Sequence, residues 1–183
     1  MPNCPDAGLF LLHSSLRPIL HSLAVKSEPP PAVVSSDQFS TGQFRPHGRV
    51  EIWAEDSAAG TIVYAIAQGP FNAEFVKVFQ MVRADLFRSR PISKIYGNVV
   101  QLHTSILSSP DTLETYANFL GTLASDPAAP AATAWVVAPE VEGREFMLPL
   151  FERLFVQSGH RFKAFESLSE AQSWITAIIA PAA

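Results

Sequence analysis

Cysteine is nearly missing from this chain of 183 residues, which has only Cys4. One thiol excludes an intramolecular disulfide and any metal site built from several cysteines. The opening stretch also lacks a basic start, and its apolar core, residues 8–12, is shorter than the ~7–15 residues of a secretory signal. Because disulfides are typical of secreted proteins, we expect a cytoplasmic protein.

Charged residues are scarce as well. Lysine and arginine number 13 and aspartate and glutamate 17, so that charged residues make up 16% of the chain and the formal net charge is −4. The basic residues are scattered, whereas nucleic-acid binding needs a concentrated basic surface. No apolar run approaches the ~20 residues of a membrane helix. The composition therefore argues against a nucleic-acid partner and against an integral membrane segment.

Residues 1–46 differ in composition from the rest of the chain. The prolines at 29–31 cannot lie in a helix interior or in a central strand, and a flexible composition rich in serine follows them. We expect residues 1–46 to be a flexible leader, so that a chain starting near Phe44 should keep its cooperative melt. The alternative is a docking helix, because apolar residues recur at helical spacing before the prolines: Leu9, Leu12, Leu16, Ile19, Leu20 and Leu23.

Strand and helix patterns alternate through residues 47–180, which we expect to form a single domain. Hydrophobic residues make up 48% of the chain, enough for one core. The predicted strands are Arg49–Glu55, Thr61–Gln68, Ile95–His103, Thr133–Ala138 and Arg161–Phe165. Helices are predicted after the cap Asn72, after Ser109-Pro110, over about Glu142–Ser158, and after the capping box at 167–170. The third helix is expected to bury Phe146 with Met147, and the last to bury Trp174.

This order of elements predicts an α/β fold. The first two strands are separated by a short loop and should form an antiparallel hairpin, whereas strands separated by helices should be parallel, with right-handed crossovers. The order β-β-α-β-α-β-α-β-α therefore predicts a mostly parallel five-stranded sheet with an antiparallel N-terminal hairpin and flanking helices.

Three segments carry a resemblance to a known family: GRVEIWAE with TIVYAIAQGPF, then VVQLHTSILSSPDTLETYANFL, then FKAFESLSEAQSWI. Over residues 47–178 this pattern resembles the STAS domain of anti-sigma factor antagonists and its relatives among small STAS-like and Sec14-like bacterial proteins. The resemblance implies a STAS-like fold and a binding role. Anti-sigma antagonists carry an Asp-Ser-Ser/Thr-Gly-type step with a phosphorylated serine, whereas residues 104–109 here have hydroxyls with no acid before them and no glycine after. The resemblance therefore does not extend to the phosphorylation motif.

Binding sites in open α/β sheets gather beyond the carboxyl ends of the strands. The residues that we predict to form a site there are His103, Ser105, Ser109, Glu140, Glu142 and Arg144. His103, Ser105 and a glutamate are the residue types of a hydrolytic triad, but no nucleophile elbow accompanies them. The histidine and the glutamates also lack a metal-ligand spacing. Ser109 is expected to cap a helix, with a phosphate or anion site as the alternative.

We therefore expect a non-enzymatic regulatory or interaction domain, without cofactor, metal or catalytic residues, that binds a protein partner or a small ligand at this edge. The alternative is a lipid or apolar small-molecule carrier, suggested by thirteen phenylalanines and the Phe-rich helix 146–155. A closed apolar pocket of several hundred Å³ would favour the carrier. A small hydrolase that uses His103 and Ser105 is a less favoured third possibility. The sequence leaves open the partner, the ligand, phosphorylation and the oligomeric state.

Overall fold

The computed structural model describes residues 32–39, 45–92 and 95–180. The predicted leader up to residue 31, with Cys4, lies outside the described residues. The strands are β1 (Val34–Ser35), β2 (Arg49–Ser57), β3 (Gly60–Gln68), β4 (Tyr96–His103), β5 (Ala132–Val137) and β6 (Phe162–Phe165). The helices are α1 (Ala73–Ser89), α2 (Pro110–Ala124), α3 (Arg144–Ser158) and α4 (Leu168–Ile179), with a short 3₁₀ helix η1 (Ser36–Gln38). The predicted α/β class is confirmed.

The six strands lie side by side in chain order, from β1 to β6. β2 and β3 pair antiparallel along their whole lengths and are joined by Ala58 and Ala59 alone. β3, β4, β5 and β6 are parallel neighbours, each connected to the next by a helix. Parallel strands need such crossovers, whereas a tight loop can only reverse the chain. The antiparallel hairpin followed by parallel strands is therefore as predicted.

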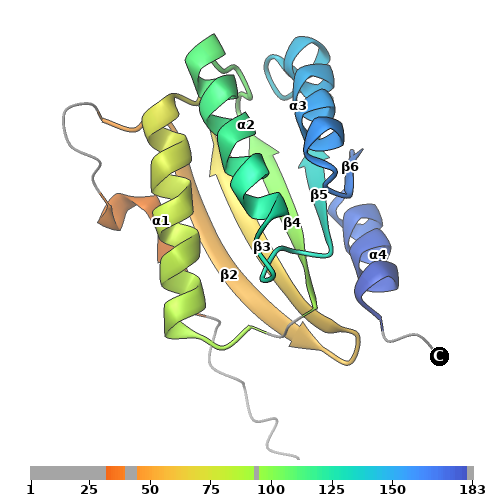
Figure 1. The fold of residues 1–183 in the computed structure, drawn as a ribbon. Helices are drawn as coiled ribbons and strands as arrows, with labels where there is room; N and C mark the ends of the chain where they lie inside the picture. The colour runs from red at the N-terminus through yellow and green to blue at the C-terminus, as the bar shows by residue number, and fades with distance from the viewer. Residues whose placement is uncertain (1–31, 40–44, 93–94, 181–183) are drawn as a thin grey trace, which may run out of the picture. The chain divides into compact units, whose positions relative to one another are not determined.

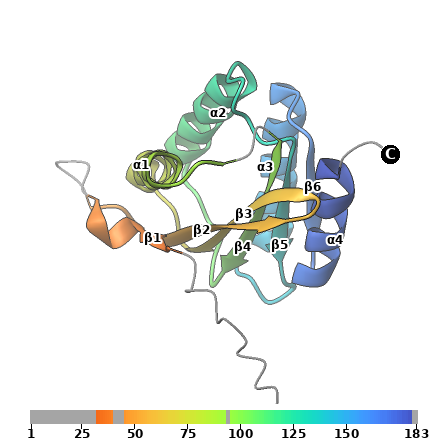
Figure 2. The same cartoon turned by 90° about the horizontal axis from the view of Figure 1, so that it is seen from below.

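Helices α1, α2 and α3 cover one face of the sheet, and α4 covers the other (Figure 1 and Figure 2). Alternate residues of each strand divide between the two faces. In β2, Val50, Ile52 and Ala54 point into the core under the three helices. Trp53 belongs to the α4 side, where its ring stacks on that of Tyr64 with 5.5 Å between centroids. No helix in the described part of the chain is long and apolar enough to span a membrane.

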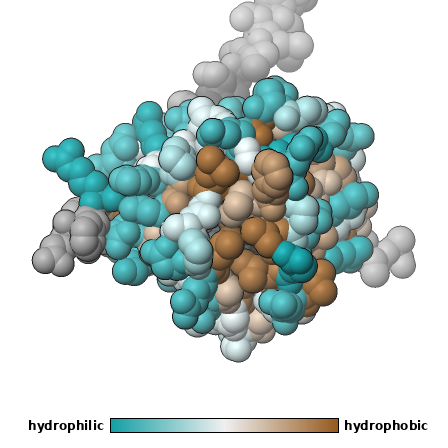
Figure 3. Space-filling view, turned by 90° about the horizontal axis from the view of Figure 1, so that it is seen from above, coloured by the Kyte–Doolittle hydropathy of each residue, from teal (hydrophilic) through white to brown (hydrophobic). Residues whose placement is uncertain are grey.

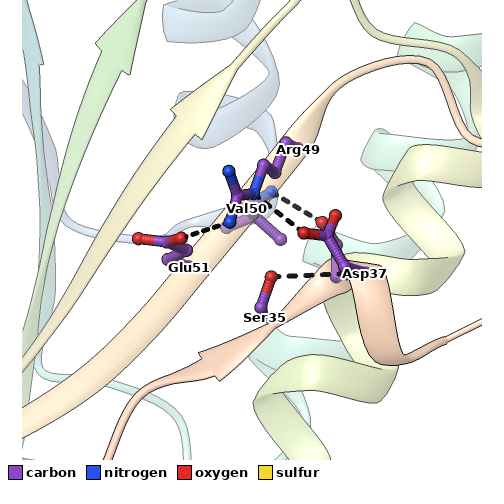
Figure 4. Close-up of polar contacts among 6 residues, drawn as sticks. Ser35, Asp37, Arg49, Val50 and Glu51 are labelled. Carbon is purple, nitrogen blue, oxygen red and sulfur yellow. Dashed lines mark hydrogen bonds and ion pairs between the residues drawn. The ribbon is translucent and has the colours of Figure 1, made fainter.

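The sixth strand, β1, was not predicted, because a strand of two residues shows no periodicity. Its Val34 is 7% exposed and belongs to the core. Ser36 is also buried, and its hydroxyl accepts a hydrogen bond of 3.0 Å from the backbone N–H of Val50. Beside it, the Arg49 guanidinium lies 3.2 Å from the Asp37 carboxylate (Figure 4). Residues that the sequence analysis assigned to the leader thus pack on β2.

We expect these contacts to be measurable in two truncated chains, one starting at Ala32 and the other at Phe44. The shorter chain should lose about 1–3 kcal/mol of unfolding free energy, because it loses the burial of Val34 and the hydrogen bond between Val50 and Ser36. Urea denaturation of both chains measures the difference. Equal midpoints and slopes would show that β1 and η1 contribute nothing to the domain.

Helix α4 buries a narrower stripe than predicted. Ala171, Ile175 and Ile179 are buried against the sheet. Trp174 is only partly buried, with its ring 5.7 Å from that of Phe165. Its prediction as a core residue is therefore wrong. The helix is rotated so that small and aliphatic side chains face the sheet.

Candidate functional site

Three loops meet where the parallel strands end. They are residues 69–72 after β3, 104–109 after β4, and 138–143 after β5. The backbone N–H of Phe71 donates to the Leu107 carbonyl at 2.9 Å. The Glu142 N–H donates to the Thr104 carbonyl, and the Ile106 N–H to the Glu142 carbonyl, both at 2.9 Å. The loops therefore continue the parallel pairing of the sheet through isolated bridges between Phe71 and Ser108 and between Ser105 and Glu142.

Two glycines allow this close approach. A side chain on Gly69 would overlap the backbone carbonyl oxygen of Ser105. Gly143 has φ +79°, a left-handed conformation, and a Cβ there would lie 2.6 Å from the Cδ2 atom of Leu107. The three loops are thus packed to contact, so their geometry is set by the fold and not by a ligand.

Thr104 is the one described non-glycine residue with positive φ, at 63°. A β-branched residue adopts this conformation only when its surroundings impose it. Its hydroxyl oxygen lies 2.6 Å from the His103 carbonyl oxygen and 3.0 Å from the Gly69 carbonyl oxygen, and its own carbonyl accepts from the Glu142 N–H. Thr104 therefore links all three loops. This role could not be predicted from the sequence, because threonine carries no signal for positive φ.

His103 and Ser105 form no hydrogen bond with each other in the described part of the chain. The His103 side chain is exposed at the end of β4 and makes no hydrogen bond within the described part of the chain. Ser105 is 3% exposed, and its hydroxyl accepts from the backbone N–H of Leu107 at 3.2 Å. The serine therefore supports its own loop.

Arg144 is held by an ion pair that the sequence analysis did not predict. Its Nη2 atom lies 2.6 Å from Oε1 of Glu166, in the connection between β6 and α4. Its Nε atom is buried and has no hydrogen-bond partner among the residues that the structure describes. Glu140 and Glu142 are exposed. Within the described residues, no group of three histidine, cysteine or acidic side chains is arranged to hold a metal ion.

Ser109 occupies the N-cap position of α2, followed by Pro110 as predicted, but its hydroxyl does not cap the helix. It donates to the Asp111 carboxylate and lies 2.8 Å from the Thr112 hydroxyl. The hydrogen bond from Ser109, aided by backbone N–H groups of the first turn, lowers the pKa of Asp111. The prediction of a serine cap is therefore wrong in this detail. The chain's own carboxylate takes the place where an external anion would bind.

The exposed apolar side chains at this edge were not predicted from the sequence. Leu107 is 39% exposed and Phe146, in the first turn of α3, is 77% exposed. Figure 3 views the end where the parallel strands stop and shows hydrophobic surface in its middle with hydrophilic residues around it. Helical spacing had predicted Phe146 as buried beside Met147. The helix instead turns Met147, Phe151 and Phe155 inward.

Acidic side chains flank this apolar surface. Around Phe146 along the chain stand Glu140, Glu142 and Glu145, and Glu166 is brought there by its contact with Arg144. Arg144 is the only cation among these residues, and it is already paired. The part of the edge around Phe146 therefore combines an exposed apolar group with four glutamates and one arginine.

A small apolar cavity of about 60 Å³ lies below the edge, between the sheet and the three-helix layer. Its lining includes Phe71, Phe75, Phe79, Tyr116, Trp135 and Phe151. Burial raises the pKa of Tyr116, whose hydroxyl has no hydrogen-bond partner within the described residues.

No family model matches the chain, and no curated protein and no solved structure is significantly similar to it. The resemblance to the STAS domain is supported only as far as the mixed α/β topology. Function therefore has to follow from the geometry of the described residues.

Proposed function

We propose that this protein is a non-enzymatic interaction domain that binds a protein partner through the edge formed by the loops after β3, β4 and β5. The observation that carries the proposal is Phe146, a large apolar side chain that is 77% exposed at this edge. Single exposed apolar residues are common, but apolar surface rimmed by polar residues is typical of interaction sites. Aromatic residues also dominate the binding energy of interfaces.

The charges around Phe146 indicate the chemistry of the partner. Glu140, Glu142 and Glu145 stand near it, while the nearby Arg144 is neutralised by Glu166. A complementary partner presents an apolar anchor flanked by lysine or arginine. Such charge complementarity mainly accelerates association and selects the partner, whereas the apolar contact holds the complex together.

The remaining predicted residues have different parts in this proposal. His103 stands exposed at the end of β4, where it can contact a partner. Ser105 and Arg144 act inside the protein, because the first fixes the backbone of Leu107 and the second anchors α3 to Glu166. Loops held in this way are preorganised, which reduces the entropy lost on binding.

The STAS-like assignment and the cytoplasmic location belong to the same proposal. The element order and the antiparallel hairpin support a STAS-like regulatory domain. We do not propose phosphorylation of Ser105, because this residue is buried.

A carrier of apolar molecules is the second candidate, and the aromatic cavity below the edge favours it. Enclosing a drug-sized ligand takes about 300–1,000 Å³. The cavity of about 60 Å³ is much smaller, so the carrier requires α1 and α2 to separate. The interaction domain requires no such movement.

The test compares two exposed residues of α3. Phe146→Ser removes the apolar group at the edge, whereas Val156→Ser removes a group that is 78% exposed later in the helix. Both variants should unfold within about 0.5 kcal/mol of the parent, as surface substitutions do. Phe146→Ser should reduce quantitative capture of a partner from the native host at least tenfold, and Val156→Ser should leave it unchanged.

Raised salt should slow association of that partner, because salt screens the glutamates of the rim. A captured protein counts as a partner only if it responds differently to the two variants. If every captured protein binds Phe146→Ser and Val156→Ser equally well, this edge is not the binding surface.

A further inference from the structure

A second pocket, of about 240 Å³, lies between α1 and the last part of α2. Because α2 begins at the edge described above and ends here, the two sites are at opposite ends of this helix. The residues that line the pocket are Gln80, Arg83, Phe119, Thr122, Leu123 and Asp126. The lining thus combines a cation, an anion, two uncharged polar groups and two apolar side chains.

Arg83 is fixed in this pocket by neutral partners. Its Nη2 atom donates to the Tyr96 hydroxyl at 2.8 Å and to the Ala128 carbonyl at 3.3 Å. The guanidinium carbon lies 4.6 Å from the centroid of the Phe87 ring. No described carboxylate forms an ion pair with Arg83, and its Nε and Nη1 atoms have no hydrogen-bond partner within the described residues.

This geometry leaves Arg83 suited to an oxyanion. A guanidinium is always charged at physiological pH. Because Nη2 already donates to Tyr96 and Ala128, the Nε–H and Nη1–H groups of Arg83 are left to donate single hydrogen bonds to a carboxylate. Arg83 is held in place before binding by the ring of Phe87 and by its two acceptors. Little side-chain entropy remains to be lost when a ligand arrives.

Asp126 gives the pocket its opposite charge. The Asp126 carboxylate is partly buried and accepts a hydrogen bond of 2.8 Å from the backbone N–H of Ala128. It is not ion-paired with Arg83, although both line the same pocket. Phe119 and Leu123 add apolar surface to the lining.

We propose that this pocket binds a small zwitterion whose carboxylate pairs with Arg83 and whose ammonium pairs with Asp126. The methylene groups between the two charges pack against Phe119 and Leu123. The volume is below the ~300 Å³ at which pockets for drug-sized ligands begin, so the ligand is of amino-acid size. Inorganic phosphate is disfavoured, because Asp126 repels a multiply charged anion that has no cationic group.

The test is isothermal titration of the full chain with a series of ω-amino carboxylates: glycine, β-alanine, 4-aminobutanoate and 6-aminohexanoate. Affinity should peak at one chain length, because the two charged residues are fixed in place. Acetate, propylamine and inorganic phosphate should each bind at least tenfold more weakly than the best member. Titration with ligand up to about 20 mM detects complexes whose Kd lies in the millimolar range. If no member of the series binds under these conditions, the proposal fails.

Two variants and one control test whether Arg83 and Asp126 bind the ligand. Arg83→Met keeps an unbranched side chain without donors, and Asp126→Asn keeps an acceptor for the Ala128 N–H. Each of these two variants should lower the affinity for the tightest-binding zwitterion at least tenfold. The control Arg88→Met, on the same helix but in an exposed ion pair with Asp85, should leave binding unchanged.

Asp126→Asn should also change the preference, since acetate should bind it more tightly than it binds the parent chain. If Asp126 had only a structural role, its replacement would not tighten the binding of acetate. Equal binding of the zwitterion by Arg83→Met and the parent chain, or tighter binding of phosphate than of any zwitterion, would overturn the proposal. The capture experiments at Phe146 do not depend on this pocket, so the two proposals can fail separately.

Discussion

Replacing Trp135 by alanine should lower the free energy of unfolding by about 3–5 kcal/mol, the cost of removing a large buried aromatic side chain. Trp135 lies in β5 and is 5% exposed. Its ring contacts three phenylalanines of α3 and β6, with centroid distances of 4.9 Å to Phe151, 5.6 Å to Phe155 and 5.4 Å to Phe162. Tyr116 of α2 lies 6.1 Å away. The residue therefore joins two helices and two strands.

The large cost follows from the void that would remain. Trp135 already lines the small apolar cavity, so its removal would enlarge an existing space that the surrounding rings cannot fill. Urea denaturation measures the change, with Trp174→Ala as the matched comparison. Because Trp174 is only partly buried, its replacement should cost clearly less. A cost of under about 1 kcal/mol for Trp135→Ala, typical of surface sites, would contradict the assigned core.

Gly69→Ala should cost about 3 kcal/mol or more, because the new methyl group overpacks a site that cannot relax. The clash is with the backbone carbonyl of Ser105 and not with the end of a flexible side chain. That backbone is held on both sides, since the Ser105 N–H donates to the His103 carbonyl at 2.8 Å and the next residue, Ile106, donates to Glu142. Relief of the clash therefore requires the loops after β3 and β4 to separate.

The control for this substitution is Gly121→Ala. Gly121 lies within α2, and a Cβ there would meet nothing within 4 Å. Since alanine is a better helix former than glycine, this variant should gain about 0.5–1 kcal/mol. Differential scanning calorimetry of both variants gives the comparison. If Gly69→Ala melts with the parent chain, the three loops are not packed as the structure has them.

The elements themselves were predictable from the sequence because each depends on neighbours in the chain. The apolar spacing from Phe75 to Leu86 forms one helix face, and Asn72 caps that helix by accepting from the Phe75 N–H, as predicted. The placement of His103 at a strand end and of Glu140 in the next loop also followed from local pattern. In an α/β fold, strand ends alone identify the edge where loops meet.

The sequence did not reveal which side chains are available at that edge. The burial of Ser105 depends on the loops after β3 and β5, which close around it through long-range backbone hydrogen bonds. The neutralisation of Arg144 depends on Glu166, which lies 22 residues later. The exposure of Phe146 depends on the rotation of α3 against the sheet, which a helical pattern with phenylalanines on several sides leaves open.

The sequence by itself therefore determined the fold class, the hairpin and the sheet edge where the loops after the parallel strands meet. Only the tertiary structure decided that β1 joins the sheet, that Leu107 and Phe146 are exposed at the edge, and that Arg83 and Asp126 share a pocket. The physical reason is the range of the interactions. Secondary structure follows from propensity and periodicity over a few neighbouring residues, whereas burial, ion pairing and pockets arise where segments distant in the chain are packed together.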